Sequence, residues 1–254
     1  RQALALYSQI GDLWRLGSSN RSQAKIDSLY AEMQTRYSQV GQRTACLMVT
    51  IEQLRAHTEV PMERLDSLMM TYADEPLCAE LYIEKVRGLM KRGEHHTAEA
   101  IKVCDEGLRR YPRYARVNEL RNLKAQLLQP RLTASLARPY YPGDSLRLRL
   151  QYRHLASMRM HIYKAKVEEY PMEYAEDEVR LGALRGRQIW SETYALPVHR
   201  QEGVAPDEWP YLTNRQEQAF ALSLDEGLYV VELEPLGIAR PEKARFLLPV
   251  SRLH

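Results

Sequence analysis

The spacing of apolar residues changes near residue 130, and this change constrains the fold more than any other feature. From Leu146 to Arg153 apolar and polar residues alternate strictly, which is typical of a strand with one buried face. Before residue 130 the apolar residues recur every three or four positions, as on one face of a helix. The 254 residues are therefore expected to form a multi-domain α-then-β protein, with helices in 1–128 and strands in 129–254.

The first part predicts about seven helices. Pro61 and Pro76 suit a first helical turn, Gly93 follows a basic last turn, and Pro112 ends a helix. The expected ranges are about 3–14, 22–40, 42–57, 61–72, 76–92, 94–110 and 113–128. Because the loops are short, neighbouring helices should run antiparallel as hairpins. The chain also starts within a helical pattern, so we expect the natural protein to continue before Arg1 and beyond the C-terminus.

Two arrangements of these helices stay open. Gly88, Ala100 and Pro112 recur at intervals of twelve and place small residues where helices would cross closely. This spacing resembles a tetratricopeptide repeat, although its aromatic positions are missing and no second copy is evident upstream. The first domain is therefore read as a tetratricopeptide-like array of helical hairpins, with a plain helical bundle as the alternative.

The second part predicts seven short antiparallel strands, which favour an immunoglobulin-like β-sandwich. Their expected ranges are 132–138, 145–153, 157–166, 187–196, 217–224, 228–235 and 244–251. Tyr-Pro-Gly-Asp at 141–144 is a turn motif, and Asp-Glu-Gly at 225–227 predicts a hairpin between the fifth and sixth strands. Longer loops are expected at 168–186, which is acidic, and at 197–216.

Several stretches together resemble a bacterial alpha-2-macroglobulin-like protein. The turn at 141–144 leads into a strand ending in Tyr152-Arg153, and the next strand contains Ile162-Tyr163, as in the first macroglobulin domain of that family. The stretch 224–235, "LDEGLYVVELEP", is similar to a late strand of the same domain. Large envelope proteins of the Bacteroidetes carry a helical region before this domain, which is the order found here.

This resemblance implies a non-catalytic structural and interaction segment of a larger endopeptidase inhibitor that traps proteases. Its partners would be neighbouring macroglobulin-like domains of the same chain, together with proteases or envelope proteins. The protein would lie in the periplasm or cell envelope, held to the membrane only by a lipoprotein-type anchor outside this segment. The family's thioester motif has Gln three residues after Cys, but Gly107 stands three residues after Cys104, so trapping chemistry would lie elsewhere.

The sequence offers no catalytic, cofactor-binding or metal-binding residues that we would name. Common catalytic and nucleotide-binding motifs are missing. His95 and His96 are adjacent and would diverge on a helix, and the acidic run 168–178 lacks calcium-loop spacing. The three cysteines, Cys46, Cys78 and Cys104, fit buried inert thiols. We therefore expect no enzyme and no cofactor.

The charge pattern also excludes some partners. Basic and acidic residues are nearly balanced, 36 against 33, so a nucleic-acid surface is not expected. Arginines at 147, 149, 153 and 159 are expected near one another on the polar face of two adjacent strands. Two other functions stay open, a peptide- or protein-binding helical-repeat adaptor with an accessory sandwich, and an enzyme with convergent catalytic groups.

Overall fold

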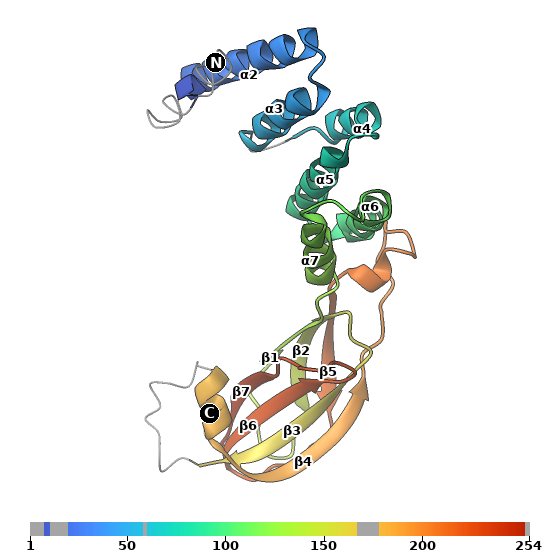
Figure 1. Cartoon of the computed structure of the whole chain (residues 1–254). Helices are drawn as coiled ribbons and strands as arrows, with labels where there is room; N and C mark the ends of the chain where they lie inside the picture. Colours follow the sequence, from blue (N-terminus) through green and yellow to red (C-terminus); the bar gives the residue numbers. More distant parts are fainter. Residues whose placement is uncertain (1–7, 11–19, 58–59, 167–177, 252–254) are drawn as a thin grey trace. The chain divides into compact units, whose positions relative to one another are not determined.

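The computed structural model describes residues 8–10, 20–57, 60–166 and 178–251. Contacts between residues divide the chain into two compact units, Arg1–Leu127 and Leu128–His254 (Figure 1). Described helices of the first unit precede two antiparallel sheets of the second, so the expected order of helices then strands is confirmed. Each unit is described below by itself.

The first unit consists of consecutive helices that pack on their neighbours in sequence. Contacts join α2 to α3, α4 to α5, α5 to α6 and α6 to α7. The α-helices are α2 (Asn20–Gln39), α3 (Arg43–Arg55), α4 (Met62–Thr71), α5 (Ala79–Arg92), α6 (Thr97–Arg110) and α7 (Val117–Leu127). Short 3₁₀ turns, η1 (Pro76–Cys78) and η2 (Glu94–His96), precede α5 and α6. The expected helix at 3–14 lies mostly outside the described residues, of which 8–10 are helical.

Several helix starts differ from the expected ones, and α6 begins at Thr97 rather than near 94 because η2 precedes it. Pro61 is the extended residue before α4 rather than part of its first turn. Pro76 opens a 3₁₀ turn, and α5 begins only at Ala79. The last helix begins at Val117 instead of near 113, because residues 112–116 form turns closed by the hydrogen bond from the Val117 N–H to the Tyr114 carbonyl.

Small residues allow the helices of this unit to approach closely, as the sequence indicated. Ala100 is fully buried, and Gly107 lies against the side chains of Tyr82 in α5 and Leu120 in α7. A Cβ built on Gly107 would lie 2.7 Å from Leu120 Cδ1. The apolar face of α2 also packs into a core, because Ile26 and Met33 both belong to one cluster of buried apolar residues in this unit.

The described residues of the second unit form seven strands in two antiparallel sheets. Sheet order is β1-β2-β5 in the first and β4-β3-β6-β7 in the second. The elements are β1 (Arg131–Leu136), β2 (Leu146–Arg153), β3 (Ser157–Ala165), α8 (Glu178–Ala183), β4 (Arg185–Ala195), η5 (Trp209–Tyr211), β5 (Asn214–Phe220), β6 (Gly227–Pro235) and β7 (Ala244–Val250). All seven expected strands are present, each within a few residues of its expected bounds.

One hydrophobic core joins the two sheets. Alternation in β2 buries Leu146, Leu148 and Leu150 on one face, and β3 contributes Met160 and Ile162 from the other sheet. The turn at 141–144 forms as expected, with the Asp144 N–H donating to the Tyr141 carbonyl over 3.0 Å and Gly143 at φ 88°.

The hairpin predicted across 225–227 is wrong. β5 pairs with β2, whereas β6 pairs with β3 and β7, so the connecting segment passes from one sheet to the other. Leu222 and Leu224 of this segment are buried in the shared core. The buried Tyr140 hydroxyl donates to the Leu222 carbonyl over 2.9 Å and accepts from the Leu224 N–H over 3.3 Å. These bonds satisfy backbone groups that a hairpin would have paired.

The two expected loops contain regular structure. In 168–186 the described residues form α8 and the start of β4, and most of the acidic run lies outside the described residues. The loop expected at 197–216 contains η5, and its last residues already belong to β5, which begins at Asn214.

Candidate functional site

The most concentrated group of chemically active side chains lies on the outer face of the four-stranded sheet. Because side chains alternate along a strand, β3 directs Met160 and Ile162 into the core and His161 away from it. His161 lies opposite Glu232 of β6, and Glu232 lies opposite Arg245 of β7. The sheet register therefore brings residues from three strands into one row.

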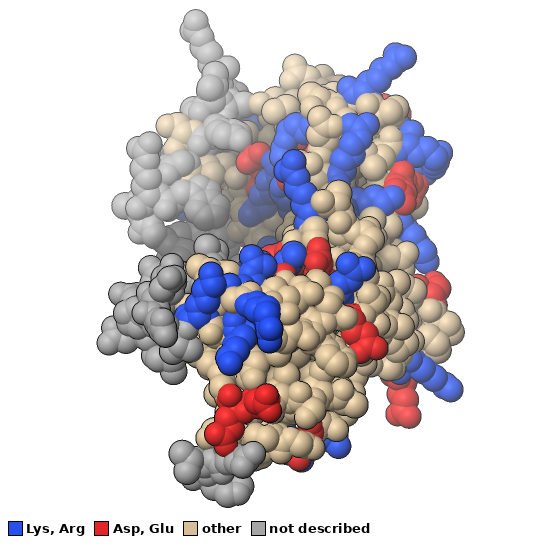
Figure 2. All heavy atoms as spheres, turned by 90° about the horizontal axis from the view of Figure 1, so that it is seen from below, with Lys and Arg blue, Asp and Glu red and all other residues tan. Residues whose placement is uncertain are grey.

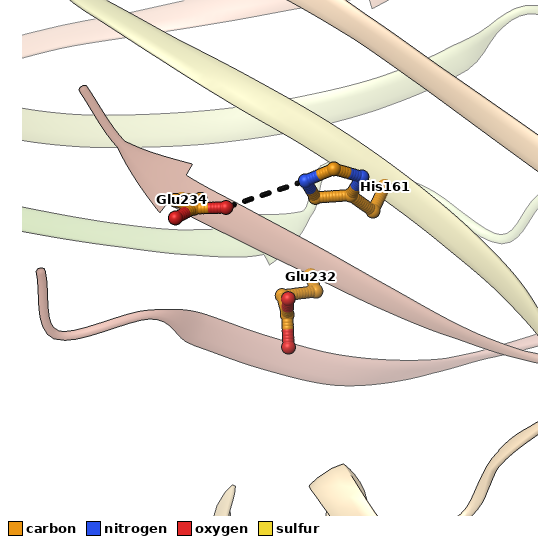
Figure 3. A group of neighbouring side chains, drawn as sticks. All are labelled: His161, Glu232 and Glu234. Carbon is orange, nitrogen blue, oxygen red and sulfur yellow. Dashed lines mark hydrogen bonds and ion pairs between the residues drawn. The ribbon is translucent and has the colours of Figure 1, made fainter. Parts of the chain in front are cut away.

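His161, Glu232 and Glu234 form a possible ligand set for a cation by distance alone. Their ligand atoms all lie within 4.8 Å of one another, the only such group of three among the described residues. Figure 3 shows the His161 ring directed toward Glu234, with His161 Nε2 lying 3.4 Å from Glu234 Oε2. Glu232 lies next to both.

Glu232 is the central residue of this group, and it is already surrounded by cations. Its side chain is 1% exposed. Glu232 Oε2 accepts from Arg245 Nε over 2.6 Å and from Arg185 Nη1 over 3.0 Å, while Glu232 Oε1 lies 3.1 Å from Lys243 Nζ. Burial alone would raise the pKa of Glu232, but the hydrogen bonds from Arg245 and Lys243 outweigh it and hold this pKa below its usual range.

Lys243 already bridges the two carboxylates that a metal ion would need. Its ammonium lies 3.1 Å from both Glu232 and Glu234, and these two carboxylates raise its pKa although burial opposes the shift. Three cations thus face two carboxylates, so a divalent ion would enter a region that is already positive. The donor set does not fit a metal unless Lys243 leaves, and the group is better described as a buried ion-pair network.

This network was not predicted from the sequence. A signal was present, because Glu232 and Glu234 stand two apart in the apolar stretch 227–235 and must share one face of its strand. The sequence pattern could not show which segment packs over that face of the sheet. Helix α8 contacts β7, Leu181 in α8 is buried, and the Gly182 carbonyl accepts from Arg185 Nε over 2.9 Å.

A second buried carboxylate connects the helices of the first unit. Glu80 in α5 has a 4% exposed side chain. It accepts from Arg55 of α3 over 2.5 Å, from Arg116 over 2.8 Å and from the Tyr114 hydroxyl over 2.6 Å. Hydrogen bonding to Glu80, after burial, raises the pKa of Tyr114 to about 12. This group ties α3, α5 and the segment before α7 together, which is a structural role.

The first unit also contains an open cleft with a volume of about 860 Å³. It is lined by the end of α3, the connection to α4, the start of α4 and the second half of α5. Its lining combines apolar side chains with several basic ones. From the sequence, Lys91-Arg92 could be recognised only as a basic last helical turn, because the residues across the cleft from them are about thirty positions away.

The thiols behave largely as expected. Cys78 and Cys104 are fully buried in helical segments, and burial raises the pKa of Cys104 to about 12. Cys46 is only partly buried and accepts a hydrogen bond from the Tyr72 hydroxyl at 3.6 Å. Cys104 is therefore a buried residue of α6, which agrees with the expectation of a buried thiol.

The grouping expected for the arginines is wrong in one respect. Arg147, Arg149 and Arg153 lie in β2, but Arg159 lies in β3, which belongs to the other sheet. The chain turns between the two strands through His154, whose φ is 55°. Arg147 pairs with Glu217 across the sheet at 3.4 Å. Figure 2 shows basic and acidic side chains together on one face of the molecule, among uncharged residues.

Two further sequence features, the adjacent histidines and the acidic run at 168–178, can be placed only in part. His95 and His96 lie in η2, and neither belongs to the one potential ligand group found in the described part of the chain. Residues 168–177 of the acidic run lie wholly outside that part, so the run stays a sequence feature.

Comparison with known proteins identifies no family. No family model matches the chain, and no curated protein matches it significantly. Among the described residues, every helix is too short or too polar to cross a bilayer.

Proposed function

We propose that this chain is a non-catalytic structural and interaction segment of an envelope-located alpha-2-macroglobulin-like protein. In this proposal the helices are a tetratricopeptide-like region, and the two sheets are a macroglobulin-like sandwich of immunoglobulin type. The observation that carries it is the arrangement of three and four antiparallel strands around one core, directly after a series of packed helices. The resemblance at 141–153 and 224–235 adds to this support.

The buried ion pairs also support a structural role. A catalytic carboxylate must reach a substrate, whereas Glu232 is closed in by Arg185, Lys243 and Arg245. Glu80 is likewise engaged by side chains from two other segments of its unit. In both groups the charges connect elements of the fold.

The partners in this proposal are neighbouring macroglobulin-like domains of the same polypeptide, and proteases held by the complete protein. The natural protein would be anchored in the periplasm or cell envelope by a lipid outside this segment. Its trapping chemistry would also lie outside residues 1–254.

The test uses the complete natural protein that contains this chain. Mixed with a protease, it should suppress cleavage of a large protein substrate while a small chromogenic peptide is still cleaved, because enclosure blocks large substrates only. Deletion of 128–254 should abolish this difference, and the chain 1–254 alone should hydrolyse neither substrate. A reading frame that ends soon after His254, or protection that survives the deletion, would contradict the proposal.

A further inference from the structure

The cleft beside α5 is large enough for a peptide. Its volume of about 860 Å³ lies within the usual range of ligand sites, roughly 300–1,000 Å³. Its described lining comes from residues 54–57 and 60–62 on one side and from 84–92 on the other. Both regions belong to the first unit, so the cleft is formed by packing within that unit alone.

Basic groups converge on this cleft from α5. Arg87 and Gly88 come three and four positions after Glu84, and Lys91 comes four and three positions after these two, so all four share one face of the helix. Arg87 is held by Glu84 at 3.3 Å and by Glu119 at 2.5 Å. Its charge is therefore fixed in place at the wall of the cleft.

The end of α5 contributes two more basic side chains, Lys91 and Arg92, to the cleft. Lys91 and Arg92 are exposed, and no ion pair is recorded for either within the described residues. Arg55 of α3 also lines the cleft, although Glu80 and Glu84 already bind it. Arg55 and Arg87 are each paired with two or more carboxylates, so the uncompensated positive charge of the described lining lies at Lys91 and Arg92, where an anionic ligand would bind.

The rest of the lining is apolar. Leu54 and Met62 are buried at the base, and Val60 and Pro61 add apolar surface. The missing side chain of Gly88 makes room for the end of Met62, which would collide with a Cβ there. A ligand that fills this cleft therefore needs apolar side chains as well as negative charge.

We propose that this cleft binds an extended acidic peptide segment of a partner protein, in which carboxylates alternate with apolar residues. A nucleic acid fits less well, because the described lining offers a base only the His57 ring, whose Nε2 already lies 2.9 Å from Asp27 Oδ1. A single phosphate is too small for the volume and would leave the apolar base unfilled. The inference goes beyond the proposed function and is independent of it, since the site lies wholly in the helical unit.

The test measures binding of a fluorescent peptide of alternating Glu and Leu to the full chain by anisotropy. The Gln-for-Glu peptide and a single-stranded oligonucleotide of equal charge serve as comparison ligands. Binding of the Glu-Leu peptide should be tightest and should weaken as salt is added. The double variant Lys91→Glu, Arg92→Glu should bind it about tenfold more weakly.

The matched control is Arg109→Glu, Arg113→Glu, which reverses two exposed charges of the same unit outside the cleft. This control should bind the peptide as the natural chain does. Both variants change exposed side chains, so their helix signal in circular dichroism should be unchanged. Equal loss in both variants, no binding to the natural chain, or tighter binding of the oligonucleotide would overturn the proposal.

Discussion

Replacing Glu232 by Gln tests whether the charge network on the four-stranded sheet stabilises the second unit. Gln keeps the shape and one acceptor oxygen but leaves three cations without their shared carboxylate. Removing one partner of a buried ion pair costs about 3–5 kcal/mol. Here Arg185, Lys243 and Arg245 are 37%, 26% and 20% exposed, so water can partly replace the lost carboxylate.

The expected loss for Glu232→Gln is therefore about 2–3 kcal/mol. For a unit of this size, each kcal/mol lowers the melting temperature by about 4 °C, so calorimetry should show a decrease of about 8–12 °C. The matched control is Glu217→Gln, because Glu217 pairs with Arg147 on the other sheet and both side chains are 45% exposed. This exposed pair should contribute less than about 1 kcal/mol.

The pH dependence gives an independent check on Glu232. Its pKa is lower in the folded state than the ordinary value of 4.5. A lowered pKa contributes stability that is present above the unfolded-state pKa and is lost as the pH falls through the folded-state pKa. The gap in stability between the natural chain and Glu232→Gln should therefore narrow below about pH 4.5. A gap no larger than that of Glu217→Gln at pH 7 would refute the reasoning.

Three further predictions concern the cores and the thiols. Gly107→Ala should destabilise the helical unit by about 1–2 kcal/mol in urea unfolding, because its Cβ would collide with Leu120, whereas Gly88→Ala meets only a flexible side-chain end and should be near neutral. In a thiol titration with a disulfide reagent, the folded chain should react at Cys46 alone, and all three cysteines should react in denaturant; fast modification of all three before unfolding would contradict the burial. Tyr140→Phe should lower the free energy of unfolding of the sheet unit by about 1–2 kcal/mol, because two backbone groups lose their shared hydroxyl partner.

The strands could be predicted from the sequence because their side chains alternate, and the local pattern is sufficient for that. The pairing of β5 with β2 could not, because a turn motif at 225–227 serves equally for a hairpin or for a crossing between sheets. The path of this segment is fixed by a distant residue. The Tyr140 hydroxyl binds the crossing segment from more than eighty positions away.

The candidate sites show the same limit. The sequence placed Lys91 and Arg92 at a helix end, but the other side of the cleft is formed by residues 54–57 and 60–62. It also placed Glu232 in a strand, but its burial depends on the short helix α8 in a region expected to be a loop. Local periodicity fixes which face a residue occupies, whereas its neighbours on that face come from distant segments.

The network around Glu232 also restricts how this sheet can vary. Losing one of the three cations leaves two to balance the carboxylate, so single changes at Arg185 or Lys243 should be tolerated. Losing the carboxylate leaves several like charges crowded together. If substitutions were to replace this network by apolar residues, the cations would have to be replaced first and Glu232 last. The order of the substitutions would therefore matter as much as the residues introduced.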